Sequence, residues 1–155
     1  MSSSQSITID SRELGRLGEE FARAYLEQQG YRIVAANFTL PVGRNLRDAI
    51  VTAEIDLVAY DGPTLCFVEV KTRASDWFMP PQVNIDRRKQ RQVSRAARAY
   101  RRMFGLVGDR YRFDVVTVVL PANPQDGRFR IELMRNFWTD ANLRKSHRHY
   151  DGYYD

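Results

Sequence analysis

The stretch that decides the fold is AEIDLVAYDGPTLCFVEVKTR, residues 53–73. Apolar and β-branched runs flank a turn signal at Asp61, Gly62 and Pro63, so we expect two strands joined by a turn. Side chains alternate along a strand, and Glu69 and Lys71 therefore share a face with the apolar residues that precede them. Charges on such a face are costly unless they pair with each other or bind a metal ion.

Asp56, on the first of these strands, completes the spacing D-x12-E-x-K with Glu69 and Lys71. Two carboxylates from neighbouring strands can hold Mg²⁺ or Mn²⁺, and the backbone carbonyl of Val70 is a candidate third ligand. Such an ion polarises a phosphodiester, and a lysine on the same face can orient or deprotonate the attacking water. The alternative is a structural ion pair between Glu69 and Lys71. Strand alternation also places Glu54 on the face of Asp56, either as a further ligand or as a solvated strand end.

Length and composition favour a single domain without a membrane span. The chain has 155 residues, of which 43% are hydrophobic and 28% charged, as in ordinary globular proteins. No apolar run approaches the length of a membrane helix, and the N-terminus lacks a secretory signal. The single cysteine, Cys66, lies mid-strand and fits a reducing compartment, so we expect a cytoplasmic location. The net charge of +5 favours a polyanionic partner.

An amphipathic helix is predicted from Asp10 or Ser11 to Gln29, before Gly30. Glu19 lies at the edge of its apolar stripe among small residues. That position makes Glu19 either a solvated helix glutamate or a carboxylate that faces the sheet.

A second helix, predicted over residues 87–104, contains arginines and a lysine but no acidic residue. Helical spacing places five arginines in one band: Arg88, Arg91, Arg95, Arg98 and Arg102. The opposite band is apolar: Val93, Ala96, Ala97, Tyr100, Met103 and Phe104. Lys89 belongs to the apolar band, where it either reaches an anion or extends to solvent. Because no carboxylate balances the arginine band, we favour phosphate contact over a merely solvated face.

The remaining segments complete a single domain over residues 11–138, with a flexible arm at 1–10 and a polar tail at 139–155. Further strands are predicted over residues 31–38, 112–120 and 128–134. Residues 41–52 and 74–86 are expected to be loops because they contain prolines and lack a clear period. Trp77, Phe78 and Met79 in the second loop either pack on the core or offer a stacking wedge to a nucleic acid.

The chain resembles the YraN-like family of bacterial proteins in four features: GRLGEEFARAYLEQQGYRIVAANF, EIDLVAYDGPTLCFVEVKTR, a lysine that opens an arginine-rich helix, and RFDVVTV. That family in turn resembles the PD-(D/E)XK nuclease superfamily, particularly the archaeal Holliday-junction resolvases. The resemblance covers residues 12–138. It implies an α/β, restriction-endonuclease-like fold of three layers, with a mixed central sheet flanked by helices in the order αβββαβ.

By motif, the resemblance assigns metal-site roles to Asp56 and Glu69, the lysine role to Lys71, and the helix carboxylate to Glu19. Lys89 matches the lysine that opens the second helix. The chain departs from the family pattern in three places: Ala53 replaces a glycine, residues 41–52 are longer, and the loop after residue 73 lacks a small glycine-containing run. These departures concern substrate choice more than metal binding.

The expected function is therefore a Mg²⁺- or Mn²⁺-dependent endonuclease acting on DNA, including branched or otherwise structured DNA. The main alternative is a nucleic-acid-binding module with the same fold that does not cut. A third reading is an adaptor whose basic helix docks an acidic protein. The sequence leaves the oligomeric state open, a homodimer included.

Overall fold

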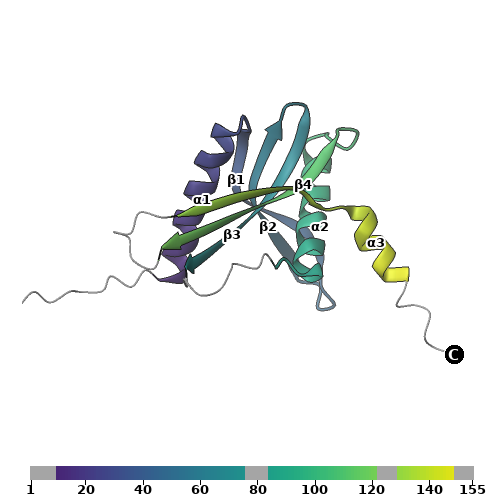
Figure 1. The fold of residues 1–155 in the computed structure, drawn as a ribbon. Helices are drawn as coiled ribbons and strands as arrows, with labels where there is room; N and C mark the ends of the chain where they lie inside the picture. The colour runs from purple at the N-terminus through teal and green to yellow at the C-terminus, as the bar shows by residue number, and fades with distance from the viewer. Residues whose placement is uncertain (1–9, 76–83, 122–128, 149–155) are drawn as a thin grey trace, which may run out of the picture.

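A five-stranded mixed sheet, in the order β1-β2-β3-β4-β5, forms the central layer of the protein (Figure 1). The structure is a computed structural model, and it describes residues 10–75, 84–121 and 129–148. Its strands are β1 (Arg32–Arg44), β2 (Ile50–Asp61), β3 (Thr64–Ser75), β4 (Tyr111–Pro121) and β5 (Arg130–Trp138). Its helices are α1 (Ser11–Gln28), α2 (Arg87–Met103) and α3 (Asp140–Arg148). Only β3 and β4 pair in parallel. The predicted mixed α/β fold of the restriction-endonuclease-like type is confirmed.

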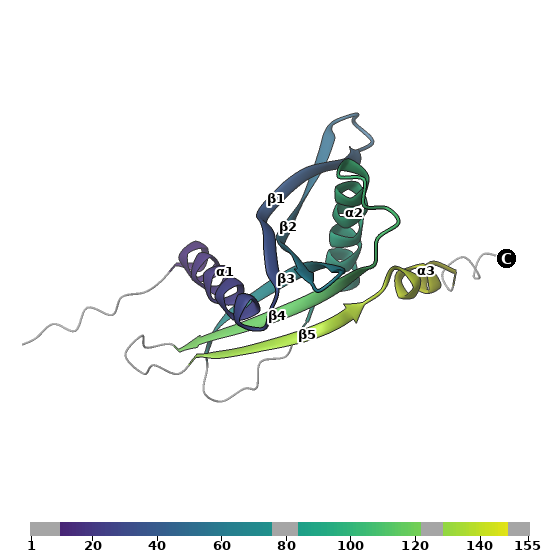
Figure 2. The ribbon, with the colours of Figure 1, turned by 90° about the horizontal axis from the view of Figure 1, so that it is seen from above.

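Helices α1 and α2 lie on opposite faces of the sheet (Figure 2), and alternation along β3 supplies an apolar surface to each. Cys66 and Val68 are fully buried in the core on the α1 side. Leu65 and Phe67 are fully buried in the core on the α2 side. Strand β3 is therefore buried on both faces. This packing fixes the position of the residues that follow Val68.

Helix α1 packs unusually close to β3 through Gly18. Its N-cap is Asp10, whose Oδ1 accepts a hydrogen bond from the Glu13 N–H at 2.8 Å. Gly18 is buried, and a Cβ at this position would overlap the side chain of Thr72. The missing side chain allows the helix to approach β3, and it carries the neighbouring Glu19 to the sheet.

Strands β1 and β2 extend as a bent ribbon where a loop is predicted. Residues 41–52 are mostly strand, and only residues 45–49 connect β1 to β2. Pro41 interrupted the strand pattern in the sequence, yet β1 is an edge strand, where a proline is tolerated. The ribbon crosses α2 (Figure 2), and Arg95 Nη2 donates to the Val42 carbonyl at 3.1 Å.

The bend also changes which face Ile55 occupies. Alternation places Ile55 with Leu57, but Ile55 packs with Val58 on the α2 side, while Leu57 packs on the α1 side. The reason is that β2 pairs with β3 only from Leu57 onward. Before Leu57, β2 pairs with β1 but not with β3. Alternation along this part of β2 therefore no longer assigns its side chains to the two faces of the central sheet.

Helix α2 begins after Asp86, whose Oδ1 accepts a hydrogen bond from the Lys89 N–H at 2.8 Å. Most of its predicted apolar band is buried: Val93, Ala96, Ala97 and Tyr100. The exceptions are Met103 and Phe104, which are 56% and 50% exposed, so their predicted burial is wrong. They lie at the last turn, where Gly105 ends the helix with φ of 67°.

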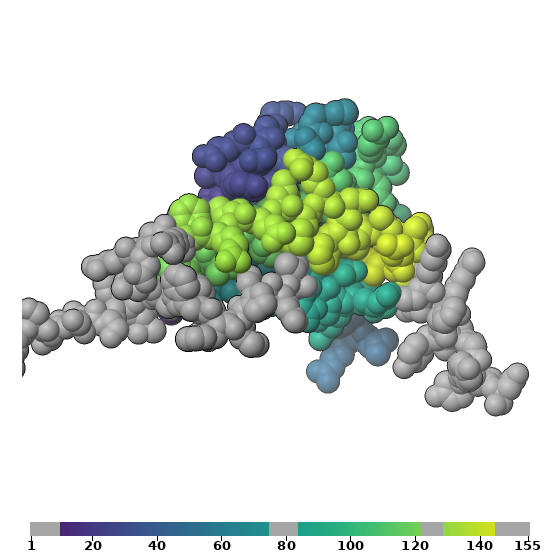
Figure 3. Space-filling view, viewed as in Figure 1, coloured from purple at the N-terminus to yellow at the C-terminus, as the bar shows by residue number. Residues whose placement is uncertain are grey.

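Helix α3 occupies part of the segment that the sequence assigns to a polar tail. Leu143 is 9% exposed and packs in the core on the α2 side, and Figure 3 shows β5 and α3 together on one face. Residues 1–9 and the trio Trp77, Phe78 and Met79 lie outside the described residues. Among the helices described, none is long and apolar enough to span a lipid bilayer.

Candidate metal and phosphate-binding site

Asp56 lies at the fork where β2 separates from β3. The ladder between these strands begins one residue later, at the pair Leu57 and Val68. Asp56 Oδ2 accepts a hydrogen bond from the backbone N–H of Val70 at 2.8 Å. The carboxylate thus satisfies a β3 donor that the departing β2 backbone does not reach, and this bond fixes its position beside Glu69.

Glu69 is a buried carboxylate that lacks a full set of partners. Its side chain is 5% exposed, and Oε1 lies 3.5 Å from Lys89 Nζ. Oε2 is buried, and no donor among the described residues hydrogen-bonds to it, although Asp56 lies close enough to share a proton with Glu69. Burial, followed by the nearby charge of Asp56, raises the pKa of Glu69 to about 8, against the opposing effect of Lys89. Burial likewise raises the pKa of Asp56, although the Val70 N–H favours its charged form.

Three carboxylates from two elements converge beside this fork. Oxygen atoms of Glu19 on α1 and of Glu54 and Asp56 on β2 all lie within 4.8 Å of one another. Burial raises the pKa of Glu19, and the charges of Asp56 and Glu54 add to the shift, while a hydrogen bond with Asn37 opposes it. Glu54 is exposed, as a solvated strand end would be, and its carboxylate also belongs to this cluster, so both readings of Glu54 stay open.

This donor set fits a hard divalent cation. Mg²⁺ and Mn²⁺ prefer carboxylate, carbonyl and water oxygens, and the fork supplies several carboxylates. Glu69 Oε2 adds a buried oxygen to which no donor of the described residues hydrogen-bonds, apart from a proton shared with Asp56, and a cation would be a suitable partner for it. The backbone N–H of Val70 is bound to Asp56, and the metal-ligand role of the Val70 carbonyl stays a prediction.

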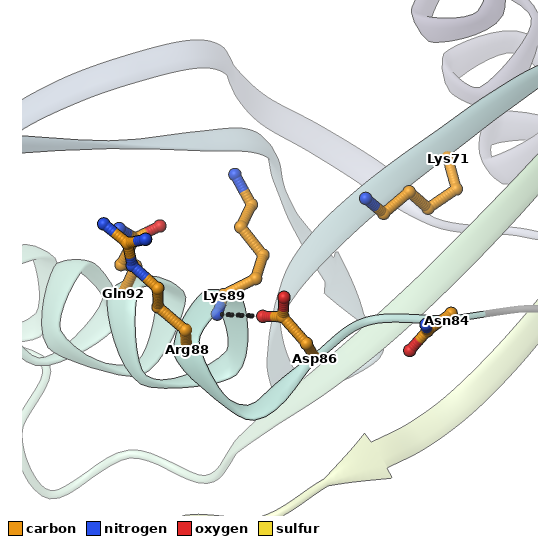
Figure 4. Close-up of a pocket in the computed structure, with 6 residues that line it drawn as sticks. All are labelled: Lys71, Asn84, Asp86, Arg88, Lys89 and Gln92. Carbon is orange, nitrogen blue, oxygen red and sulfur yellow. Dashed lines mark hydrogen bonds between the residues drawn. The ribbon is translucent and has the colours of Figure 1, made fainter.

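A hollow of about 330 Å³ opens between β3 and the start of α2 (Figure 4). It is lined by Lys71, Asn84, Asp86, Arg88, Lys89 and Gln92. Lys71 extends from β3 and Lys89 from α2, and both amines point into the space between these elements (Figure 4). The start of a helix also favours anions. The hollow is therefore suited to a phosphate group next to the carboxylates.

The predicted arginine band is exposed along α2: Arg88, Arg91, Arg95, Arg98 and Arg102. In the described part of the chain, no ion pair engages any of the five. We call these five residues the arginine face. Arg95 alone is held by the fold, through its hydrogen bond to the Val42 carbonyl.

Two features of the region escape sequence reasoning. Arg101 is only 8% exposed, and its guanidinium lies 3.7 Å from the ring centroid of Tyr111. Nothing in the sequence distinguishes it from the exposed arginines, apart from its position between the two bands of the helix. The convergence of Glu19 with Glu54 depends on the ribbon bend, which the sequence pattern does not reveal.

The model of the uncharacterised protein family UPF0102 matches residues 18–118. The chain belongs to the UPF0102 family. A UPF0102 protein of Desulfosudis oleivorans is 41% identical over 135 residues, which cover 87% of this chain and 96% of the relative. A UPF0102 protein of Solibacter usitatus is 43% identical over 111 residues, covering 72% and 78%. A UPF0102 protein of Chlorobium limicola is 37% identical over 135 residues, covering 85% and 97%. The predicted family resemblance is confirmed, and the UPF0102 match spans the fork, the hollow and the arginine face.

Proposed function

We propose that this UPF0102 protein is a Mg²⁺- or Mn²⁺-dependent endonuclease that hydrolyses phosphodiester bonds in DNA. The observation that carries the proposal is the buried pair of Glu69 and Asp56, in which Glu69 Oε2 receives no hydrogen bond from the described residues other than a proton that the two carboxylates share. An unpartnered buried carboxylate oxygen destabilises a fold. A cation held between Glu69 and Asp56 would remove that cost, and it would lie next to a basic hollow of a size that suits a phosphate.

Asp56 and Glu69 would hold the cation, with the Val70 carbonyl. Glu19 and Glu54, whose carboxylate oxygens lie within 4.8 Å of one of Asp56, would bind a second ion or its water ligands. When bound, the cation would polarise the phosphodiester and lower the pKa of a coordinated water. This division of labour agrees with the resemblance to the PD-(D/E)XK nuclease superfamily.

The basic residues position the substrate. Lys71 follows Glu69 by two residues on the same strand, about 7 Å along, and its amine faces the hollow (Figure 4). There it can orient the attacking water and neutralise charge that develops on the phosphate. Lys89 and Arg88 line the same hollow and would bind the phosphate oxygens. The rest of the arginine face would bind phosphates farther along the backbone.

One observation favours a second candidate, a nucleic-acid-binding module that does not cut. Lys89 Nζ lies 3.5 Å from Glu69 Oε1, so a cation of the protein itself already neutralises part of the proposed metal site. If that pair persists on DNA, binding would be salt-sensitive and no metal-dependent product would form.

Calorimetric titration of Mg²⁺ and Mn²⁺ into wild type and Asp56→Asn separates these candidates. We expect wild type to bind the ion and Asp56→Asn to lose binding, with cleavage of linear or branched DNA slowed by at least about 100-fold. DNA affinity should be kept or improved in the variant, since a negative charge near phosphate is removed. Asp109→Asn, in the exposed loop after α2, serves as the matched control and should behave as wild type.

Cleavage by purified Asp56→Asn at the wild-type rate would contradict the assignment. Failure of wild type to bind either ion, even with DNA present, would favour the module that does not cut.

A further inference from the structure

The tip of the β1–β2 ribbon is a turn fixed by its own hydrogen bonds. The side-chain Oδ1 of Asn45 accepts from the backbone N–H of Arg47 at 2.9 Å and from that of Ala49 at 3.0 Å. The Asn45 backbone also pairs with Ala49 at 2.9 Å and with Asp48 at 3.0 Å. A turn closed in this way holds its side chains in defined directions without help from the rest of the fold.

That turn presents an apolar side chain to solvent. Leu46 is fully exposed, and Ile50 at the base of the turn is 61% exposed. Arg44 and Arg47 lie on either side of Leu46 and are also exposed. Arg44 Nη1 donates to the Asp48 carbonyl at 2.7 Å and lies 3.7 Å from Asp48 Oδ1, so an exposed ion pair also holds this arginine against the tip. An isolated exposed leucine is ordinary, but one raised on a rigid turn between two arginines has the chemistry of a DNA wedge.

The tip lies close along the chain to the point where the ribbon contacts the arginine face. Leu46 follows Val42 by four residues, at most about 14 Å of extended chain, which is less than the roughly 34 Å of one DNA turn. Arg95, a member of the arginine face, donates to the Val42 carbonyl of the ribbon at 3.1 Å. The ribbon is thus attached to the helix that would bind the backbone, and tip and helix are held in a defined relation.

We propose that the ribbon tip is a DNA wedge, in which Leu46 enters between two base pairs while Arg44 and Arg47 bind the adjacent phosphates. Apolar side chains inserted in this way unstack a base step and kink the duplex. Unstacking costs least where pairing is already weakened, so the favoured substrate is DNA with a mismatch, nick or branch. This inference rests on the proposed function only in taking DNA as the partner.

Fluorescence of 2-aminopurine reports base unstacking directly and does not require cleavage. We would place the probe at successive positions beside a mismatch in a duplex and add full-length protein in EDTA. Wild type should raise the fluorescence at one step, and Leu46→Ala should abolish that rise. Leu46→Ala should also bind the mismatched duplex about tenfold more weakly, while its affinity for a fully paired duplex stays within about twofold of wild type.

Val107→Ala is the matched control, because Val107 is 62% exposed in the loop after α2, outside the ribbon. We expect this variant to keep the fluorescence rise and the affinity of wild type. Equal fluorescence and affinity for Leu46→Ala and wild type would overturn the wedge. A dimer of wild type that forms without DNA and is lost in Leu46→Ala would overturn it as well, in favour of self-association.

The proposed wedge and the proposed nuclease activity can be rejected independently of each other. Unstacking that depends on Leu46, without cleavage under any metal condition, would uphold the wedge and reject the nuclease. Metal-dependent cleavage by wild type and Leu46→Ala, with identical probe signals, would uphold the nuclease and reject the wedge. Absence of any DNA binding by wild type would reject both.

Discussion

Asp114 on β4 and Glu69 on β3 are both buried carboxylates on adjacent strands, but their surroundings differ. Asp114 is fully buried and both of its oxygens are bound. Oδ1 accepts from the Arg112 Nε at 2.8 Å and the Asn136 N–H at 2.9 Å, and Oδ2 accepts from the Tyr31 hydroxyl at 2.9 Å. Glu69 has one long ion pair, and its other oxygen receives no hydrogen bond from a donor in residues 10–75, 84–121 or 129–148, apart from a proton shared with Asp56.

The difference shows that burial alone does not identify a functional carboxylate. Asp114 belongs to a network that joins three strands, because Arg112 also pairs with Asp61 on β2 at 2.8 Å. Burial and the adjacent Asp114 raise the pKa of Tyr31 to about 12, so its hydroxyl stays a hydrogen-bond donor. This network stabilises the fold. Glu69, in contrast, has an oxygen that receives no hydrogen bond from a donor in the described part of the chain, apart from a proton shared with Asp56, and lies beside an open hollow, as expected of the proposed metal site.

The largest expected effect comes from breaking the satisfied network. Asp114→Ala should destabilise the protein by about 3–5 kcal/mol, because the partly buried Arg112 loses one of its two carboxylates, and the Asn136 N–H and the Tyr31 hydroxyl lose their acceptor. Urea unfolding measures this change, and Tyr31→Phe provides a milder variant that should lose about 1 kcal/mol. If Asp114→Ala costs no more than Tyr31→Phe, the ion pair is not what stabilises this part of the sheet.

Removing the charge of Glu69 should raise the free energy of unfolding, whereas removing that of Asp114 should lower it. In metal-free buffer at about pH 9, we expect Glu69→Gln to be more stable than wild type by roughly 2 kcal/mol. The folded pKa of Glu69 is about 8 and its ordinary value is 4.5. The folded state therefore binds this proton more tightly, and wild-type stability falls as pH rises from about 5 to about 8. The unfolding midpoints of wild type and Glu69→Gln should converge as the pH falls toward about 5. A constant difference between the two proteins across this range would contradict the raised pKa of Glu69.

The same pKa predicts how metal binding depends on pH. Glu69 must lose its proton to bind a cation, so affinity for Mn²⁺ should rise by up to about tenfold per pH unit and level off above about pH 8. Calorimetry in buffers of different ionisation enthalpy should detect proton release on binding below that pH. An affinity that does not change between about pH 6 and pH 8 would exclude Glu69 as a ligand.

The smallest expected effect is on DNA binding and concerns two arginines, which also differ in whether carboxylates of the protein bind them. Arg112 is bound by two carboxylates, whereas Arg91 belongs to the arginine face. Arg91→Gln should weaken DNA binding about threefold and lower the salt dependence by about one ion. Arg23→Gln, on α1 and paired with Glu27 at 3.5 Å, is the control and should leave DNA binding unchanged. Equal losses of DNA affinity in Arg91→Gln and Arg23→Gln would indicate that the net charge of the protein, and not the arginine face, determines binding.

Local patterns predicted most of the fold. The runs that became β3 and β4 are apolar on both faces, and α2 has separate charged and apolar bands, so these elements follow from short-range periodicity. The ribbon was missed because Pro41 and Gly43 resemble loop residues, and their acceptance depends on β1 being an edge strand. Helix α3 was missed because Leu143 is its principal core contact in a segment rich in polar residues.

The site was predictable only in part, for a similar reason. The shared face of Glu69 and Lys71 follows from strand alternation. Of the two readings left open for Lys89, its amine lies 3.5 Å from Glu69 Oε1, and its side chain is 37% exposed. The proximity of Glu19 to Glu54 depends on two long-range features, the ribbon bend and the close approach of Gly18 to Thr72. Neither is encoded in a local period.

The parallel pairing of β3 with β4 determines when the site matures during synthesis. All of the proposed ligands precede residue 71, yet Glu69 lies opposite Val115 of β4. A ribosome releases the chain from its N-terminus, so β3 lacks this neighbour until β4 has been synthesised. The residues of the proposed site are therefore present in the nascent chain before the burial that raises the pKa of Glu69.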